Sequence, residues 1–270
     1  MNCRESQQWV PPSCQAEALN ESSGVDAPAH QIEAARQPIE PFDRWMAFAE
    51  VILCSGFPTQ LLLIGVLRAV GMPIQNGEGD LNPRFIVTIS MVDAVLVIGL
   101  VVFLLRARGE SVRDVLLGRV RVLREIWVGI AMIPLVFFVV ALIIGAVITW
   151  APELRNVPRN PFEAMLTTRF DVAVFAVVVM IAGGLREEVQ RGFIVHRFGQ
   201  YLGGGIYGVL FYSVFFGLGH YEQGYDATIA TAVLGLIWGL TYLQRKSIIA
   251  PVVSHAGFNL AQIVKQVALR

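Results

Sequence analysis

Seven long apolar stretches separated by short polar ones dominate the chain. They cover residues 45–70, 85–105, 126–150, 170–198, 205–220, 227–243 and 248–268. Each is close to the roughly 20 residues that a helix needs to cross a hydrocarbon core of about 30 Å. Because that core offers no water to backbone N–H and C=O groups, we expect each stretch to be helical. The pattern predicts an all-α, polytopic transmembrane helix bundle of about seven to eight helices over residues 44–270.

The composition supports a membrane protein and excludes one class of partner. Hydrophobic residues make up 55% of the chain and charged residues 16%, whereas soluble domains carry about 25% charged residues. A net charge of zero gives no electrostatic footprint for nucleic acid. Residues 1–43 are polar, contain several prolines and lack an early apolar run. This stretch predicts a disordered tail and not a secretory signal peptide.

The distribution of basic residues predicts an orientation. The strongest basic loop joins the second and third stretches and contains Arg106, Arg108, Arg113, Arg119, Arg121 and Arg124. Cytoplasmic loops are enriched in Lys and Arg, so we expect this loop and the tail to face the cytoplasm. Residues 244–246 then lie on the same side, and the C-terminus lies on the other. The chain is thus expected to be an integral, multi-pass protein, of the plasma membrane if its source is bacterial.

Three polar clusters interrupt the apolar C-terminal half, at residues 186–191, 216–220 and 255–259. A charged side chain at membrane depth costs roughly 2.5–3.5 kcal/mol on insertion scales, so such residues usually have a function. At about 1.5 Å per residue, the clusters lie roughly 12 to 22 Å from the predicted cytoplasmic helix ends. Antiparallel neighbouring helices could therefore bring the three clusters together in one site.

The spacing within the clusters suggests how their side chains combine. His255 and Asn259 are four residues apart and share a helix face, as do Glu187 and Arg191. Arg191 can therefore neutralise either Glu187 or Glu188 and leave the other carboxylate for chemistry. A carboxylate in a dry site is a candidate general base, and histidines can assist it, which predicts a hydrolase acting within the bilayer. Taken singly, His220 and His255 would be packing histidines, and Asn259 an interhelical hydrogen-bonding residue.

The order of these motifs resembles the CPBP family of intramembrane proteases, which includes CAAX proteases and bacteriocin-processing or abortive-infection proteins. The family signature is a glutamate pair followed by an arginine, then FxxxH, then HxxxN/D, on three successive helices. Here the motifs read Glu187-Glu188 with Arg191, Phe216 to His220, and His255 to Asn259. The resemblance covers about residues 165–268, which it marks as the catalytic core.

The resemblance implies an intramembrane endopeptidase that cleaves a membrane-associated or prenylated peptide or protein. Glu187 and His220 would hold and activate water, and His255 and Asn259 would stabilise the oxyanion. Arg191 and Glu188 would organise the site. The expected partners are the lipid bilayer and a peptide or membrane-anchored protein.

One departure from the family pattern leaves the catalytic glutamate open. The family usually has three residues between the pair and the arginine, whereas this chain has two. Alignment on Arg191 puts Arg186 in the place of the first glutamate. Alignment on the pair keeps Glu187 but rotates Arg191 by about 100° around the helix. A local bulge near Gly183-Gly184 could absorb one residue. We assign the catalytic role to Glu187, with Glu188 as the alternative.

Metal dependence is also open from the sequence. Glu187, His220 and His255 are a possible zinc set. The chain contains no HExxH motif, and the balance favours water activation without a metal.

Two other functional classes fit parts of the pattern. Glu50 and Asp93 are acids in the first two apolar stretches and could line a cavity or an ion path in a small ion or solute transporter. The lack of an internal repeat argues against that class. The shifted arginine would instead suit a catalytically inactive membrane scaffold or immunity protein of the same fold.

Overall fold

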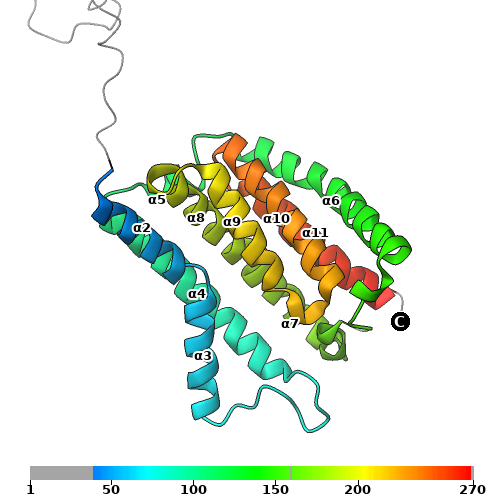
Figure 1. The fold of residues 1–270 in the computed structure, drawn as a ribbon. Helices are drawn as coiled ribbons and strands as arrows, with labels where there is room; N and C mark the ends of the chain where they lie inside the picture. The colour runs from blue at the N-terminus through cyan, green and yellow to red at the C-terminus, as the bar shows by residue number, and fades with distance from the viewer. Residues whose placement is uncertain (1–38, 159, 269–270) are drawn as a thin grey trace, which may run out of the picture. The chain divides into compact units, whose positions relative to one another are not determined.

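The computed structural model describes residues 39–158 and 160–268, and these form helices (Figure 1). Almost the whole of the predicted tail lies outside the described residues. The first described helix begins at Pro41, slightly before the predicted boundary at residue 44. An isolated β-bridge joins Gln75 and Leu81. The all-α prediction is confirmed for the part of the chain that the structure describes.

All seven predicted stretches are helical, although some are broken. The α-helices are α2 (Pro41–Leu53), α3 (Phe57–Ala69), α4 (Pro83–Ala107), α5 (Val112–Leu116), α6 (Val122–Trp150), α7 (Arg169–Val178), α8 (Glu187–Tyr201), α9 (Gly205–Leu218), α10 (Tyr225–Arg245) and α11 (Ile249–Ala268). A π-helix, η4 (Val179–Arg186), joins α7 directly to α8. Short 3₁₀ helices follow α6 and α9, namely η2 (Pro152–Leu154), η3 (Pro161–Met165) and η5 (Tyr221–Gln223).

Length and apolar composition alone identify fewer candidate membrane spans than the seven predicted stretches. Among the described helices, length and apolar composition qualify α4, α6 and α10, with α2 and α3 as a fourth span if that pair, bent by 44°, is counted as one. The helix α9 has 14 residues, so it is about 21 Å long and shorter than a typical hydrocarbon core. The continuous α7–η4–α8 rod carries charged residues in its second half. Length and hydropathy therefore do not identify these shorter or charge-bearing helices as spans.

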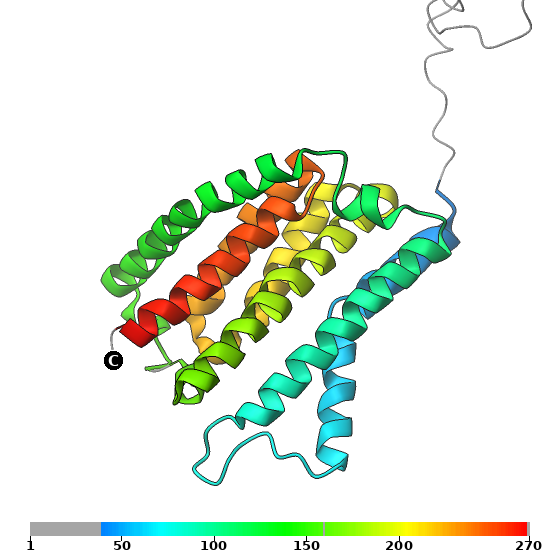
Figure 2. The same ribbon diagram turned by 180° about the vertical axis from the view of Figure 1, so that it is seen from behind.

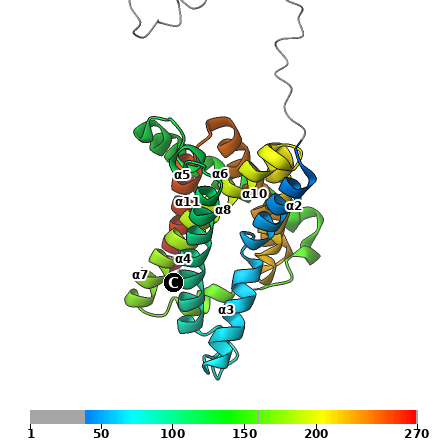
Figure 3. The ribbon, with the colours of Figure 1, turned by 90° about the vertical axis from the view of Figure 1, so that its left-hand side faces the viewer.

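The polar clusters lie in the middle of the bundle. Helices α8 to α11 form its centre, with α6 on one flank and α2 and α4 on the other (Figures 1 and 2). Seen from the side, the chain runs along α2 and α3, turns, and returns along α4 (Figure 3). The apolar core extends through the central helices and includes Phe193, Trp238 and Phe258. The C-terminal motifs are thus held on helices that pack directly against one another.

Buried ion pairs fix the C-terminal end of α8 to α2 and to the residues after α4. The fully buried Arg197 pairs with Glu50 of α2 and with Glu110. Arg108 also donates to Glu50, at 2.7 Å. Burial raises the pKa of the Glu110 carboxyl, but hydrogen bonds from His196 and Arg197 outweigh it and hold that pKa below its usual range. Glu50, a candidate for a transport path, thus serves to join helices.

Close packing between α9 and α10 depends on a glycine. A Cβ atom on Gly239 would lie 2.8 Å from Cγ1 of Val209, so Gly239→Ala should lower the free energy of unfolding by about 1–3 kcal/mol. Gly145 of α6 is a matched control, because a Cβ atom there would meet no heavy atom of the described residues within 4 Å. Gly145→Ala should be neutral or stabilising by about 0.5–1 kcal/mol. Unfolding of the two variants in detergent micelles measures the difference, and equal effects would contradict the packing argument.

Candidate active site

A π-helical segment positions the first motif. In η4 (Val179–Arg186), the wider turn inserts a residue into the helix, a feature often found at functional sites. Gly183 and Gly184 lie within it and allow α11 to approach, since a Cβ on Gly184 would lie 2.7 Å from Cβ of Ala256. A bulge thus lies at Gly183-Gly184, where the sequence allowed one, but it does not restore the spacing of the family pattern between the glutamate pair and Arg191. It precedes the glutamate pair, so Glu187 and Arg191 remain on one regular α-helix.

Glu188 takes part in a buried network of ion pairs and hydrogen bonds. It forms an ion pair with Arg191, and the side chains of both are 1% exposed. The Arg191 guanidinium also lies over the rings of Tyr212, Phe216 and Trp238, at 4.9, 4.7 and 5.5 Å from their centroids. These ring faces favour a cation. Arg191 therefore neutralises Glu188 and leaves the neighbouring carboxylate, Glu187.

His255 joins the two glutamates. Its Nδ1 lies 2.8 Å from Oε1 of Glu188, and because the carboxylate paired with Arg191 accepts, Nδ1 carries a proton and donates. Its Nε2 lies 3.7 Å from Oε2 of Glu187. The ring stacks on Trp238 with a centroid separation of 3.9 Å. These contacts fix the orientation of the imidazole, with Nε2 directed toward Glu187.

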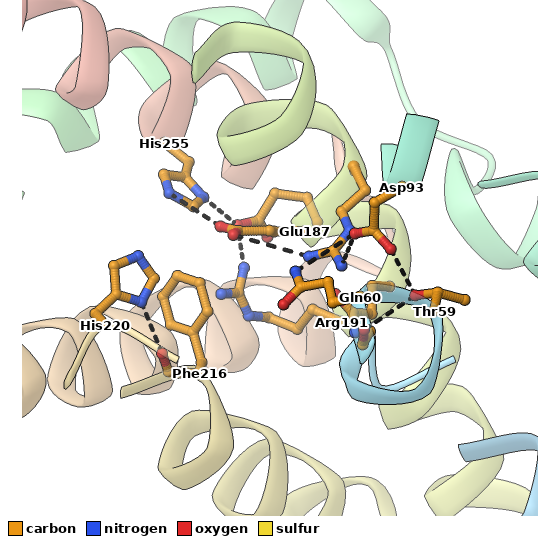
Figure 4. A network of polar contacts seen from close by, with 12 residues as sticks. Thr59, Gln60, Asp93, Glu187, Arg191, Phe216, His220 and His255 are labelled. Carbon is orange, nitrogen blue, oxygen red and sulfur yellow. Dashed lines mark hydrogen bonds and ion pairs between the residues drawn. The ribbon is translucent and has the colours of Figure 1, made fainter. Parts of the chain in front are cut away.

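Glu187 keeps hydrogen-bonding capacity. Its side chain is 17% exposed, and its Oε1 lies 3.9 Å from Nη1 of Arg186. Its Oε2 is buried and has no hydrogen-bond partner among the described residues. In Figure 4, Glu187 lies between His255 and Asp93. The Glu187 carboxylate thus lies near the charged Arg186 and near His255, but its Oε2 accepts no hydrogen bond from the described residues.

His220 presents one ring nitrogen as an acceptor. The helix α9 ends at Leu218, so His220 lies in the turn beyond it. Its Nδ1 is 2.8 Å from the carbonyl oxygen of Phe216 (Figure 4). A carbonyl can only accept, so Nδ1 donates, and Nε2 of the neutral ring keeps its lone pair. The Phe216 ring packs between the two histidines, with centroids 5.0 Å from His220 and 5.7 Å from His255.

A cavity of about 450 Å³ brings four of the predicted residues together. Its walls include Glu187, His220, His255 and Asn259. Glu188 and Arg191 do not contribute to this wall and lie behind it. A smaller cavity, of about 80 Å³, also reaches Glu187 and His220. The structure therefore assembles the three motifs around one volume that is large enough for part of a substrate.

Asp93 and Arg186 belong to the same site, although the motifs do not include them. They form a buried ion pair between α4 and η4. Asp93 also accepts from Thr59, at 2.5 Å, and from Gln60, at 3.5 Å. Asp93 and Arg186 both line the cavity. Asp93 was detectable in the sequence as an intramembrane acid, but its partner Arg186 lies far away along the chain.

The side chains do not form an evident metal site. Among the residues that the structure describes, no group of three or more His, Cys, Asp or Glu is placed to hold a metal ion. The hydrogen bonds at Nδ1 of His220 and of His255 leave Nε2 of each ring, so they do not themselves prevent metal binding. As placed in the described residues, Glu187, His220 and His255 do not form such a group, and we derive no step through a metal.

The comparison with known proteins agrees with this geometry. Residues 169–261 match the family model described as type II CAAX prenyl endopeptidase, Rce1-like. The resemblance to CPBP intramembrane proteases is thereby confirmed for this part of the chain. The match spans less than half of the chain and includes all three motifs. No curated protein and no solved structure matches. With its apolar helices, the chain is a multi-pass membrane protein, and the Rce1-like match supports a peptidase in general terms.

Proposed function

We propose that the chain is an intramembrane endopeptidase in which Glu187 is the general base, acting on a membrane-associated or prenylated peptide or protein. The observation that supports this most directly is the difference between the two glutamates. Arg191 and His255 occupy Glu188, whereas Glu187 faces the cavity with a buried oxygen that has no partner among the described residues. If the source is bacterial, we place the protein in the plasma membrane.

Water activation follows from the two acceptors that face the cavity. A water molecule has two O–H groups, and it can donate one to Glu187 and the other to Nε2 of His220. This orientation leaves an oxygen lone pair for the scissile carbonyl carbon. Glu187 takes the proton as the C–O bond forms, as a general base does. His220 orients the water, while its own Nδ1–H continues to donate to the carbonyl oxygen of Phe216.

The tetrahedral intermediate carries a negative oxygen that needs donors. In our proposal, His255 donates from Nε2 while its Nδ1–H still donates to Glu188, so both ring nitrogens carry a proton. The Asn259 amide is the second donor. Each donor of this type contributes about 2.7–4 kcal/mol. The C–N bond then breaks, and Glu187 returns its proton to the leaving amine, so protons and electrons balance.

The proposed mechanism is metal-independent, and a chelator tests it directly. Cleavage by the purified protein should continue at the same rate after removal of divalent cations. If the chelator abolished cleavage and added zinc restored it, the proposed activation of water by Glu187 and His220 alone would be wrong, and a metal would take part.

Cleavage of candidate peptides in proteoliposomes tests the function itself. The substrates are membrane-associated peptides with and without a prenylated C-terminal cysteine. His220→Ala and His255→Ala should each abolish cleavage while the protein remains folded. His196→Ala is the matched control, because His196 contacts Glu110, away from the cavity. Activity that survives both cavity variants would reject the protease, and a cellular phenotype that persists without cleavage would favour the inactive scaffold.

A further inference from the structure

The two ends of the bundle differ in charge. One end, called the basic end here, comprises the α4–α6 connection and the α10–α11 connection. Contacts hold these connections together: Ile248 N–H donates to the Leu116 carbonyl at 2.8 Å, and Tyr242 O–H to the Val115 carbonyl at 2.9 Å. The acids at these connections are Glu110, Asp114 and Glu125, and the basic residues outnumber them, namely Arg106, Arg108, Arg113, Arg119, Arg121, Arg124, Arg245 and Lys246.

The opposite end comprises the α6–α7 and α9–α10 connections. Tyr225 N–H donates to Oδ1 of Asn156 at 2.9 Å, and the Asn160 amide donates to Gln223 at 3.3 Å. The charges near these connections and the α3–α4 turn are mixed. They include Arg68, Glu78, Asp80, Arg84, Glu153, Arg155, Glu222 and Asp226. The excess of positive charge is therefore confined to the basic end.

The large cavity opens toward the opposite end. Gln262 and Lys265, near the end of α11, are exposed and line it, together with Asn160, Gln223 and Gln266. Its inner wall is buried, with Trp238 at 1% and His255 at 3% exposure. Among the described residues, none from the connections of the basic end contributes to its lining. Polar side chains at the opposite end and Glu187 in the interior thus line the same cavity.

From these observations we infer that the site exchanges water and product with the non-cytoplasmic side of the membrane. Loops rich in Lys and Arg remain in the cytoplasm, so the basic end is cytoplasmic and the cavity mouth faces away from it. This inference rests on the proposed protease and narrows its substrate class. The substrate is an exported or membrane-anchored polypeptide whose scissile bond is reached from the non-cytoplasmic face. A prenylated C-terminal tail of a cytoplasmic protein would approach from the wrong side.

Chemical labelling tests the orientation of the mouth without any assay of activity. The starting protein is full-length, with Cys3, Cys14 and Cys54 replaced by serine. Each variant of it then contains a single new cysteine. Gln262→Cys and Gln266→Cys report on the mouth, and Arg119→Cys and Arg124→Cys on the basic end. In intact bacterial cells, a membrane-impermeant maleimide should label the mouth variants, and the basic-end variants only after permeabilisation. The reverse pattern, or equal labelling of both sets in intact cells, would overturn the inference.

Cleavage of a substrate placed on one side of the membrane or the other tests from which side the site is reached. A peptide that the purified enzyme cleaves is attached to a membrane anchor on either the cytoplasmic or the non-cytoplasmic side, and each fusion is expressed with wild type or Glu187→Gln. Wild type should cleave only the non-cytoplasmic fusion. Cleavage of only the cytoplasmic fusion would reject the proposed substrate class and leave the protease intact. Identical behaviour of wild type and Glu187→Gln on both fusions would instead count against the protease itself.

Discussion

Replacement of Glu187 by glutamine is expected to lower the rate of peptide cleavage by about 10²–10⁴-fold, the usual contribution of a positioned general base. The amide has the same shape but cannot take the proton of water. Little structural loss should follow, because Oε2 of Glu187 has no hydrogen-bond partner among the described residues and Arg186 keeps its ion pair with Asp93. Initial rates in proteoliposomes, with thermal unfolding of the same preparation, measure both effects.

Glu222→Gln is a suitable control for the loss of one carboxylate. Glu222 is exposed in the turn after α9 and does not line either cavity. Its variant should cleave at the wild-type rate. Full activity in Glu187→Gln would be incompatible with the assigned role, and activity lost only in a Glu188→Gln protein that remains folded would transfer that role to Glu188.

The helical architecture was largely readable from the sequence because the apolar stretches are long. The break between α2 and α3 was not, because the stretch from 45 to 70 is mostly apolar on both sides of it. Gly56 adopts a left-handed φ of 85° there, and Pro58 lies two residues further on. Glycine and proline are the local signals of such a break, but the continuous hydrophobicity obscured them. Hydropathy reports the solvent that a helix faces and says little about its continuity.

The site was readable where chemistry is concentrated in short motifs. Glu187, His220, His255 and Asn259 were predicted as one group, and they line one cavity. The contribution of α4 was only partly readable. Asp93 was noticed as a costly acid, but its ion pair with Arg186 joins residues far apart in sequence. Such a pair depends on how η4 packs against α4, which no local spacing encodes.

The choice between the glutamates also depended on packing. Spacing alone allows Arg191 to reach either Glu187 or Glu188. In the folded chain, the aromatic rings of Tyr212, Phe216 and Trp238 hold the guanidinium on the side of Glu188. These rings come from α9 and α10, so only the assembled bundle determines which carboxylate remains available.

The Glu188–Arg191 pair is expected to carry the second large effect, on stability. Arg191→Met leaves the Glu188 carboxylate buried without its cation, and Glu188→Gln leaves Arg191 buried without its anion. Each single change should lower the free energy of unfolding by about 3–5 kcal/mol. The double variant Glu188→Gln/Arg191→Met removes both charges and should lose clearly less than the sum. Equilibrium unfolding of all four proteins in one detergent completes the cycle.

Stability and catalysis should separate in that double variant. In the double variant no unpaired charge remains buried at this position. His255, however, loses the carboxylate that accepts the hydrogen bond from its Nδ1–H. The ring can adopt the other tautomer or rotate, and oxyanion stabilisation weakens. We therefore expect a protein that is more stable than either single variant and still impaired in cleavage. Additive losses of stability would show that the pair does not act as a unit, and full activity in the double variant would remove Glu188 from the positioning of His255.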